Sequence, residues 1–192
     1  MIRIQTTLKK ALSFAVITLL LQSCSILVGT KTLYSVRNIE TMNIWGYTNL
    51  ENDNTLSTIY PRTHAVFTST IIETFAKHSL KAPIEIFAHL SFENPDPVQI
   101  ISICEENNLD CLLLSKLKFV NVTYYINFFP VFDNIDTEVE MKLFTKEGKV
   151  VAITRHNTFN GSDYMMPPTT ERTIHDATER ALKKIIKIVN KQ

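Results

Sequence analysis

The chain has 192 residues, the size of one domain, with 45% hydrophobic side chains, 20% charged side chains and a formal net charge of +1. This composition excludes a fully disordered chain and gives no reason to expect a nucleic-acid partner. The four glycines are scattered, with no two within ten residues of each other, which excludes the glycine-rich loops that hold nucleotide phosphates.

The first segment, residues 1–23, has the pattern of a secretory signal peptide. Arg3, Lys9 and Lys10 give it a positive start without any acidic residue, and an apolar run follows over residues 11–21. This run is too short to cross a bilayer core of roughly 30 Å as a helix. Without residues 1–23 the chain would carry 17 basic and 19 acidic side chains, a net charge of −2.

The end of this segment, Leu21-Gln22-Ser23-Cys24, resembles the lipobox of bacterial lipoproteins. The resemblance implies cleavage before Cys24, a diacylglyceride on its sulfur and a further acyl chain such as palmitate. Each buried methylene would contribute about 0.8 kcal/mol to membrane anchoring. Ser25, where inner-membrane lipoproteins carry aspartate, implies the outer membrane, and the lack of an acidic cluster favours its periplasmic face. The alternatives are a plain secretory signal with a chance cysteine, or a buried N-terminal helix.

The segment after Cys24 predicts a short tether, residues 24–31, before a single folded domain over 32–192. Eight extended residues reach at most about 28 Å, so we expect the domain to lie close to the membrane. Residues 32–45 predict a strand and residues 46–61 an exposed polar loop. Residues 62–80 predict a helix. Its buried stripe would consist of Phe67, Ile71, Ile72, Phe75 and Ala76.

Three strands and a short helix are predicted in the middle of the chain. The first strand covers 83–92, and the helix runs over 97–107, with Asp96 as its N-cap and Pro97 as its first residue. The helix would bury Ile100, Ile101 and Cys104. A strong strand follows over 110–119 and a second extended run reaches Phe132, where Asp133-Asn134-Ile135-Asp136 should end it.

The last third of the chain predicts a hairpin and a helix. Residues 137–144 and 149–158 would pair around Gly148, which can supply a positive φ. A helix over 170–191 has its apolar stripe at Ile174, Ala177, Ala181, Leu182, Ile185 and Ile188. Four lysines (Lys183, Lys184, Lys187 and Lys191) crowd its C-terminal half, which suits the helix dipole. The order β-α-β-α-β-β-β-β-α predicts an α/β fold of the α+β type: a mixed or antiparallel sheet covered by about three helices on one face.

This order resembles a group of envelope proteins: the N-terminal domain of the Tol-system propeller protein, the curli-secretion lipoprotein and the lipoproteins that activate penicillin-binding proteins. The segment Asn108-Leu109-Asp110, followed by an apolar strand over 111–117, stands where the group typically has Gly-Ala-Asp and a strand. Residues 137–144 and 148–151 resemble the group's later hairpin. The resemblance covers roughly 70–190, and it implies partner binding or assembly in the envelope.

Titratable and metal-binding residues give no familiar catalytic pattern. Cys104 and Cys111 form either a disulfide, which an oxidising compartment allows, or two small buried hydrophobic residues. Asp133, Asp136 and Glu138 lack the spacing and glycine of a calcium loop. The five histidines lack the spacing of a shared metal on one helix turn and are expected to be surface or core residues: His64, His78, His89, His156 and His175. We therefore expect no cofactor, no metal and no enzymatic activity.

An aromatic run is the most distinctive feature of the folded domain. Six of the 18 aromatic residues lie within 119–132: Phe119, Tyr124, Tyr125, Phe128, Phe129 and Phe132. Adjacent strand residues face opposite ways, so rings would lie on both faces. The run is either a central strand covered on both sides or a contact surface for a protein or lipid.

Three functions remain open at this point. The leading hypothesis is a non-enzymatic, lipid-anchored outer-membrane protein that binds or helps to assemble an envelope protein partner. The second is a subunit of a secretion- or envelope-associated oligomeric ring. Lys116 and Lys118 lie on the same side of their strand as Leu112 and Leu114, which weakens a ring with membrane-spanning hairpins. The third, a periplasmic enzyme of unknown type, has no motif to support it.

Overall fold

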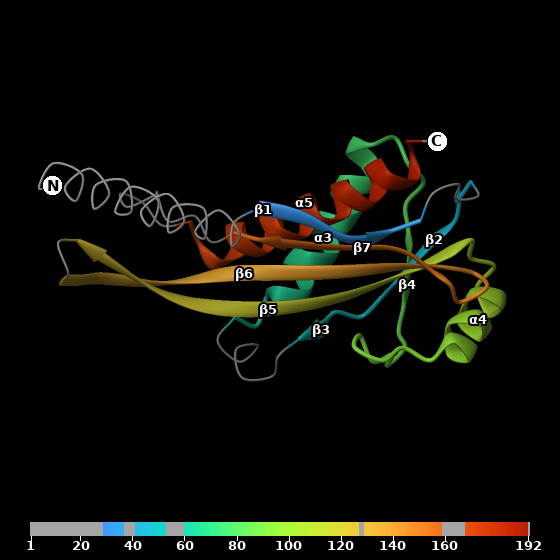
Figure 1. Cartoon of the computed structure of the whole chain (residues 1–192), viewed down its shortest axis with the longest axis horizontal. Coiled ribbons are helices and arrows are strands. Elements are labelled where there is room, and N and C mark those ends of the chain that lie inside the picture. Colours follow the sequence, from blue (N-terminus) through green and yellow to red (C-terminus); the bar gives the residue numbers. More distant parts are fainter. Residues whose placement is uncertain (1–28, 37–40, 53–59, 127–128, 159–167, 192) are drawn as a thin grey trace, which may run out of the picture.

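The computed structural model describes residues 29–36, 41–52, 60–126, 129–158 and 168–191, and over 122–134 it describes the path of the backbone. One mixed sheet forms the centre of the fold (Figure 1). Its strands are β1 (Gly29–Ser35), β2 (Trp45–Thr48), β3 (Glu51–Asn52), β4 (Ile84–Ile86), β5 (Cys111–Ile126), β6 (Phe129–Thr145) and β7 (Val150–Asn157). Its helices are α3 (Thr63–Lys77), α4 (Pro97–Glu106) and α5 (Thr170–Val189). The predicted α/β class is confirmed.

The strand order is β1-β7-β6-β5-β2-β4, and β3 also pairs with β5. The pairs β1–β7, β6–β7 and β5–β6 are antiparallel, whereas β2 runs parallel to both β4 and β5. The hairpin predicted around Gly148 is confirmed as the β6–β7 turn, and this glycine has φ +72°. β5 and β6 are the longest strands and lie at the centre of the sheet.

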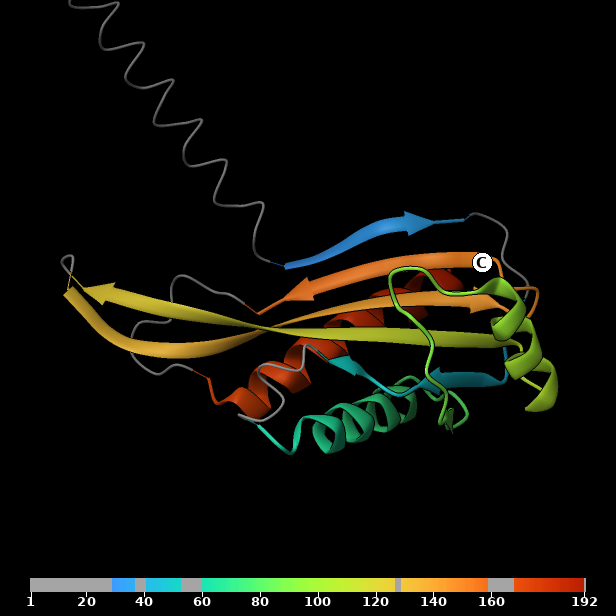
Figure 2. The same ribbon diagram turned by 90° about the horizontal axis from the view of Figure 1, so that it is seen from below.

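Helices cover both faces of the sheet, so the predicted cover on one face alone is wrong (Figure 2). On one face α3 and α5 pack against Leu113, Leu117 and their neighbours in β6 and β7. On the other face α4 and the segment before it pack against Leu112 and Leu114. The alternation of side chains along β5 explains this arrangement, since odd and even positions point to opposite faces.

The helix over 62–80 is confirmed as α3, but its buried stripe differs from the prediction. Phe67, Ile71 and Phe75 are fully buried, whereas Ile72 is 46% exposed and Ala76 also faces solvent. Buried threonines at 70 and 74 take their place on the stripe, where their hydroxyls donate to the backbone carbonyls of residues 66 and 70 at 2.6 and 2.7 Å. Polar residues can therefore occupy a core face when the helix backbone accepts their protons.

The strand predicted over 32–45 is wrong, because two separate strands lie here. β1 begins at Gly29, inside the segment expected to be tether, and pairs with β7 at the edge of the sheet. β2 continues into the predicted loop and is buried along its whole length between β4 and β5. Gly46 permits this packing, since a Cβ there would overlap Leu109 Cδ1.

The region from 83 to 136 contains two further corrections. The strand predicted over 83–92 is limited to β4, and Phe87 just after it is 79% exposed. The predicted break at Asp133–Asp136 is absent, because β6 pairs with β5 through these residues without interruption. Three strands therefore follow α4 instead of four. Asp96 caps α4 as predicted, accepting from Val98 N at 2.9 Å.

Candidate functional site

Three histidines of the described chain (His64, His156 and His175) lie in structural contacts. His156 is 3% exposed and lies 2.8 Å from the Thr30 hydroxyl, and burial lowers its pKa to about 4. His64 faces Glu85 at 3.2 Å, and His175 faces Asp176 at 3.1 Å. Within the described ranges, no three His, Cys, Asp or Glu side chains gather as a metal ion would require.

Cys104 and Cys111 are free thiols in the structure and both are buried, with exposures of 1% and 0%. Burial raises the pKa of Cys104 to about 11 and raises that of Cys111 further, with Asp110 adding to the effect on Cys111. A thiol with a raised pKa is a poor nucleophile, because the reactive species is the thiolate. These two cysteines therefore have the character of core residues.

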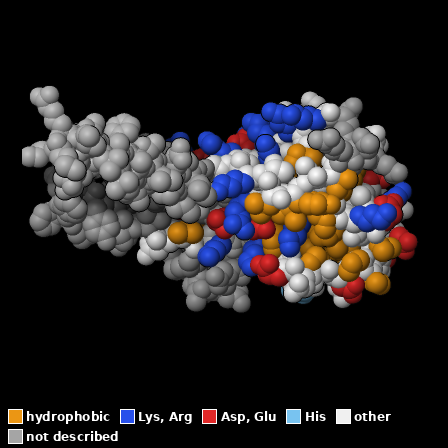
Figure 3. All heavy atoms as spheres, viewed as in Figure 1, with side chains coloured by type: hydrophobic (Ala, Val, Ile, Leu, Met, Phe, Trp, Pro, Cys, Tyr) orange, Lys and Arg blue, Asp and Glu red, His pale blue; other side chains and the backbone are white. Residues whose placement is uncertain are grey.

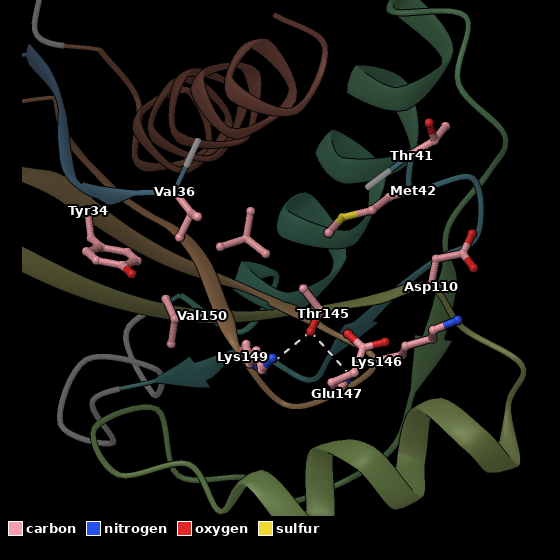
Figure 4. Close-up of a pocket in the computed structure, with 11 residues that line it drawn as sticks. Tyr34, Val36, Thr41, Met42, Asp110, Thr145, Lys146, Glu147, Lys149 and Val150 are labelled. Carbon is pink, nitrogen blue, oxygen red and sulfur yellow. Dashed lines mark hydrogen bonds between the residues drawn. The ribbon is translucent and has the colours of Figure 1, made fainter. Parts of the chain in front are cut away.

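A pocket of about 580 Å³ lies beside the β6–β7 turn and the end of β1 (Figure 4). Its apolar lining comes from Tyr34, Val36, Met42, Val150 and Val151, and charged side chains of the turn stand at its rim. Two polar side chains of the pocket already accept hydrogen bonds from backbone N–H groups. Asp110 accepts from the N–H groups of residues 43 and 44 at 2.8 and 2.9 Å, and the Thr145 hydroxyl accepts from two N–H groups of the turn.

The sheet face that α4 leaves open carries a ladder of charges (Figure 3). Lys116, Glu140 and Arg155 are direct cross-strand neighbours on β5, β6 and β7. Arg155 donates from Nη2 and Nε to Glu140 Oε2 at 2.7 and 3.0 Å, while Lys116 donates to Glu93 at 2.5 Å. The expected alternation is confirmed: Leu112 and Leu114 are buried under α4, and Lys116 lies on the same face beyond it. The charged side chains of this face therefore form ion pairs within the chain.

The long β5–β6 hairpin extends past the rest of the sheet. β7 pairs with β6 only from Glu138 onward, and β2 and β3 pair with β5 no further than Leu117. Beyond these points β5 and β6 continue as a two-stranded ribbon, from the pair Asn121–Ile135 to the pair Ile126–Phe129. We call residues 121–126 and 129–135 the arm. It points away from the helices and from β7 (Figure 1).

The arm contains most of the predicted aromatic contact surface. Phe119 stands at its base and is 5% exposed, in the core with α5. The backbones of Tyr124, Tyr125, Phe129 and Phe132 lie in the arm, where Tyr124 is the register partner of Phe132 and Ile126 that of Phe129. Phe128 and the predicted lipid-attachment residue Cys24 lie outside the described residues.

The predicted acidic cluster is tied to its neighbours. Asp136 is 1% exposed and accepts from the Thr158 hydroxyl at 3.1 Å, while Glu138 accepts from Asn157 at 3.4 Å and lies 3.8 Å from Arg155. Asp133 belongs to the stretch described by its backbone path. These contacts give the two described carboxylates a structural role.

A basic groove of about 430 Å³ between the start of β1 and α5 was not expected from the sequence as a site. It is lined by Thr30, Glu179, Arg180, Lys183, Lys184 and Lys187. The crowding of lysines in the sequence was the signal, but only the fold shows that β1 lies beside them. In the described part of the chain, no helix is long and apolar enough to cross a membrane.

No protein-family model matches this sequence, and a comparison with curated proteins finds no match. Solved structures do match. PelC from Paraburkholderia phytofirmans, described as a dodecamer, has a TM-score of 0.54 over 85% of this chain and 98% of that chain, at 10% identity. This similarity shows a shared fold.

Two further structures are similar over much of this chain. TolB from Acinetobacter baumannii has a TM-score of 0.40, 10% identity and coverage of 85% of this chain and 31% of its own. Lipoprotein GNA1162 from Neisseria meningitidis has a TM-score of 0.35, 12% identity and coverage of 75% and 99%.

Proposed function

We propose that this chain is a non-enzymatic, lipid-anchored protein of the bacterial envelope that assembles with further copies of itself at the periplasmic face of the outer membrane. The observation that carries the proposal is the arm. A two-stranded ribbon is marginally stable in water when it has no further strand or helix against it. A folded chain that keeps such a ribbon therefore has a use for it outside its own core.

The backbone of the arm supports assembly directly. Over residues 121–126 and 129–134, the described strands pair only with each other, so each has an outer edge with N–H and C=O groups that can pair with another chain. Ile135, at the base of the arm, is held by α5, since its carbonyl accepts from the Thr173 hydroxyl at 3.3 Å. The ribbon is about 20 Å long, at roughly 3.4 Å per residue. This length suits an edge-to-edge or edge-to-core contact with a neighbouring subunit.

The fold shared with PelC supports an oligomer of many identical subunits. PelC, which this chain matches over 98% of PelC's length, is described as a dodecamer. The arm leaves one end of the molecule while the β6–β7 turn stands at the other (Figure 1). A contact between unlike ends of two copies is heterologous and closes into a ring when the rotation between subunits permits. We therefore propose a closed homo-oligomer.

The membrane anchor rests on the lipobox at Leu21–Cys24. β1 begins at Gly29, five residues after Cys24, so an acylated Cys24 would hold the first strand within about 18 Å of the lipid surface. Such a short tether supports a role at one membrane and not across the periplasm. Radiolabelled palmitate tests the anchor, and we expect Cys24→Ala to abolish both the label and membrane fractionation.

Native mass after mild detergent extraction tests the assembly. We expect one discrete homo-oligomer for the full chain, and a monomer for an arm-shortened variant in which a two-residue Asn-Gly turn replaces Thr123–Asp133. The matched control is Glu73→Gln on the exposed face of α3, away from both ends of the molecule, which should keep the oligomer. A monomeric wild-type protein that recovers another envelope protein in cross-linking would instead support a hetero-partner.

A further inference from the structure

The segment from the C-terminal half of α5 to residue 191 is strongly basic. From residue 180 to residue 191 it carries five cations and no acidic residue: Arg180, Lys183, Lys184, Lys187 and Lys191. The blue side chains gather over this half of the helix, along the upper rim of Figure 3. Like charges on one surface repel each other, so the arrangement destabilises the free protein slightly and favours an anionic partner.

Among the described residues, no acidic group lies within ion-pair distance of Arg180, Lys183, Lys184 or Lys187. Glu179 lines the same groove, but its carboxylate accepts from Lys77 of α3 at 2.9 Å, and this contact lowers its pKa. The groove is therefore positive at neutral pH.

The position of the groove indicates what lies opposite it. Thr30, the second residue of β1, forms one wall, and α5 forms the other. β1 begins five positions after Cys24, so the lipid anchor of the proposed function would hold Thr30, six positions after Cys24, within about 22 Å of the membrane surface. Phospholipid phosphates at a membrane surface attract nearby basic residues, by roughly fivefold in partition for each lysine or arginine.

We infer that the groove between β1 and α5 binds the phosphate groups of anionic phospholipids in the membrane that carries the anchor. This contact would fix the orientation of the domain, with the α5–β1 side toward the membrane and the arm free to meet a neighbouring copy. The inference rests on the anchor of the proposed function, and it adds a second, electrostatic attachment with its own salt dependence.

The test uses the full lipidated chain reconstituted in vesicles of phosphatidylethanolamine with phosphatidylglycerol, and in neutral vesicles of phosphatidylethanolamine with phosphatidylcholine. Floated vesicles are treated with an amine-acylating reagent, and each lysine is followed by mass spectrometry. We expect Lys187 to react at least about fivefold more slowly in the anionic vesicles. The exposed Lys146 and Lys149 of the β6–β7 turn, which serve as internal references, should react equally in both. High salt should remove the difference.

Two variants make the assignment specific. Lys183→Gln with Lys184→Gln should return the reactivity of Lys187 to its value in neutral vesicles, whereas Lys146→Gln with Lys149→Gln should leave the protection intact. Equal reactivity of Lys187 in both vesicle types would overturn the inference while the floated protein still shows the anchor. Protection that depends on protein concentration and not on lipid charge would assign the groove to contact between copies. A chain that fails to float with neutral vesicles would refute the anchor, and the inference with it.

Discussion

Asp110 fastens the start of β2 to β5, and we expect its removal to destabilise the fold measurably. Its carboxylate accepts from Asn43 N at 2.8 Å and from Ile44 N at 2.9 Å, and its own N–H donates to the Ile44 carbonyl at 2.8 Å. Trp45, the next residue, is the register partner of Cys111. The side chain therefore fixes the point at which the chain enters the buried strand β2.

The expected magnitude follows from the exposure of the two N–H groups. A hydrogen bond to a charged group contributes about 1.5–3 kcal/mol, but water replaces the partner of an exposed donor at little cost. The bond to Asn43 is exposed and the bond to Ile44 is partly buried. We therefore expect Asp110→Ala to lower the free energy of unfolding by about 2 kcal/mol, mainly through Ile44. Asp110→Asn, which keeps one acceptor, should cost about 1 kcal/mol.

Urea denaturation of the purified chain, followed by tryptophan fluorescence, measures both variants. A loss of about 2 kcal/mol corresponds to a fall in Tm of roughly 4–8 °C for a chain of this size. Glu105→Ala on the exposed side of α4 is the control, with an expected change below about 0.5 kcal/mol. If Asp110→Ala also changed stability by less than about 0.5 kcal/mol, the carboxylate would not hold β2, and the reasoning would be refuted.

Three more predictions test the core and its titratable groups. Phe67→Ala should lower the free energy of unfolding by about 3–5 kcal/mol, because it leaves a cavity at a fully buried site. Ile72→Ala, at a position 46% exposed, should lower it by less than about 1 kcal/mol. Equal losses of the two variants in urea denaturation would contradict this packing. Cys104 and Cys111 should resist iodoacetamide at pH 8 until the chain is unfolded, since both thiols are buried and have raised pKa values; rapid labelling of the native protein would contradict this. The pKa of His156 is lowered from 6.5 to about 4 in the folded protein. As the pH falls, this histidine is therefore protonated in the unfolded chain before it is protonated in the folded one. The free energy of unfolding should thus decrease between about pH 6.5 and 4, by up to about 3 kcal/mol. His156→Gln should flatten that part of the profile, and a variant with an unchanged slope would assign the loss to other groups.

The sequence predicted the elements that depend on interactions between residues close together in the chain, or that show a clear hydrophobic periodicity. α4 was predicted with its N-cap because Asp96 and Pro97 determine a helix start within a few residues. Five of the six residues predicted for the buried stripe of α5 are buried and Ile188 is partly exposed, whereas the buried Thr173, Thr178 and Ile186 were missed. The β6–β7 turn was predicted from Gly148. In each case the determining interactions lie within one element or one turn.

Elements that depend on distant partners could not be predicted in this way. β2 contains a glycine and precedes a polar segment, so it resembles a loop until β4 and β5 pair with its two edges. Thr70 and Thr74 take core positions because the backbone of α3 accepts their protons, which hydropathy does not record. The pairing of β5 with β6 carries β6 through Asp133–Asp136, although these residues are typical of a turn.

The two proposed contact surfaces, the arm and the basic groove, could also be predicted only in part from the sequence. The aromatic run was visible in the sequence, but its location on a projecting ribbon depends on where β7 and β2 stop pairing. The lysines of α5 were also visible, and helix-dipole stabilisation explains them when α5 is considered alone. Only the position of Thr30 beside them makes a groove near the proposed anchor.

Assembly through the arm is the central claim, and native mass spectrometry of the lipidated chain in mild detergent tests it most directly. The account predicts a single homo-oligomer for the wild-type protein and for Glu73→Gln, and a monomer for the chain whose Thr123–Asp133 segment is replaced by an Asn-Gly turn. A wild-type monomer at every protein concentration, or an arm-shortened chain that keeps the full oligomeric mass, would contradict it.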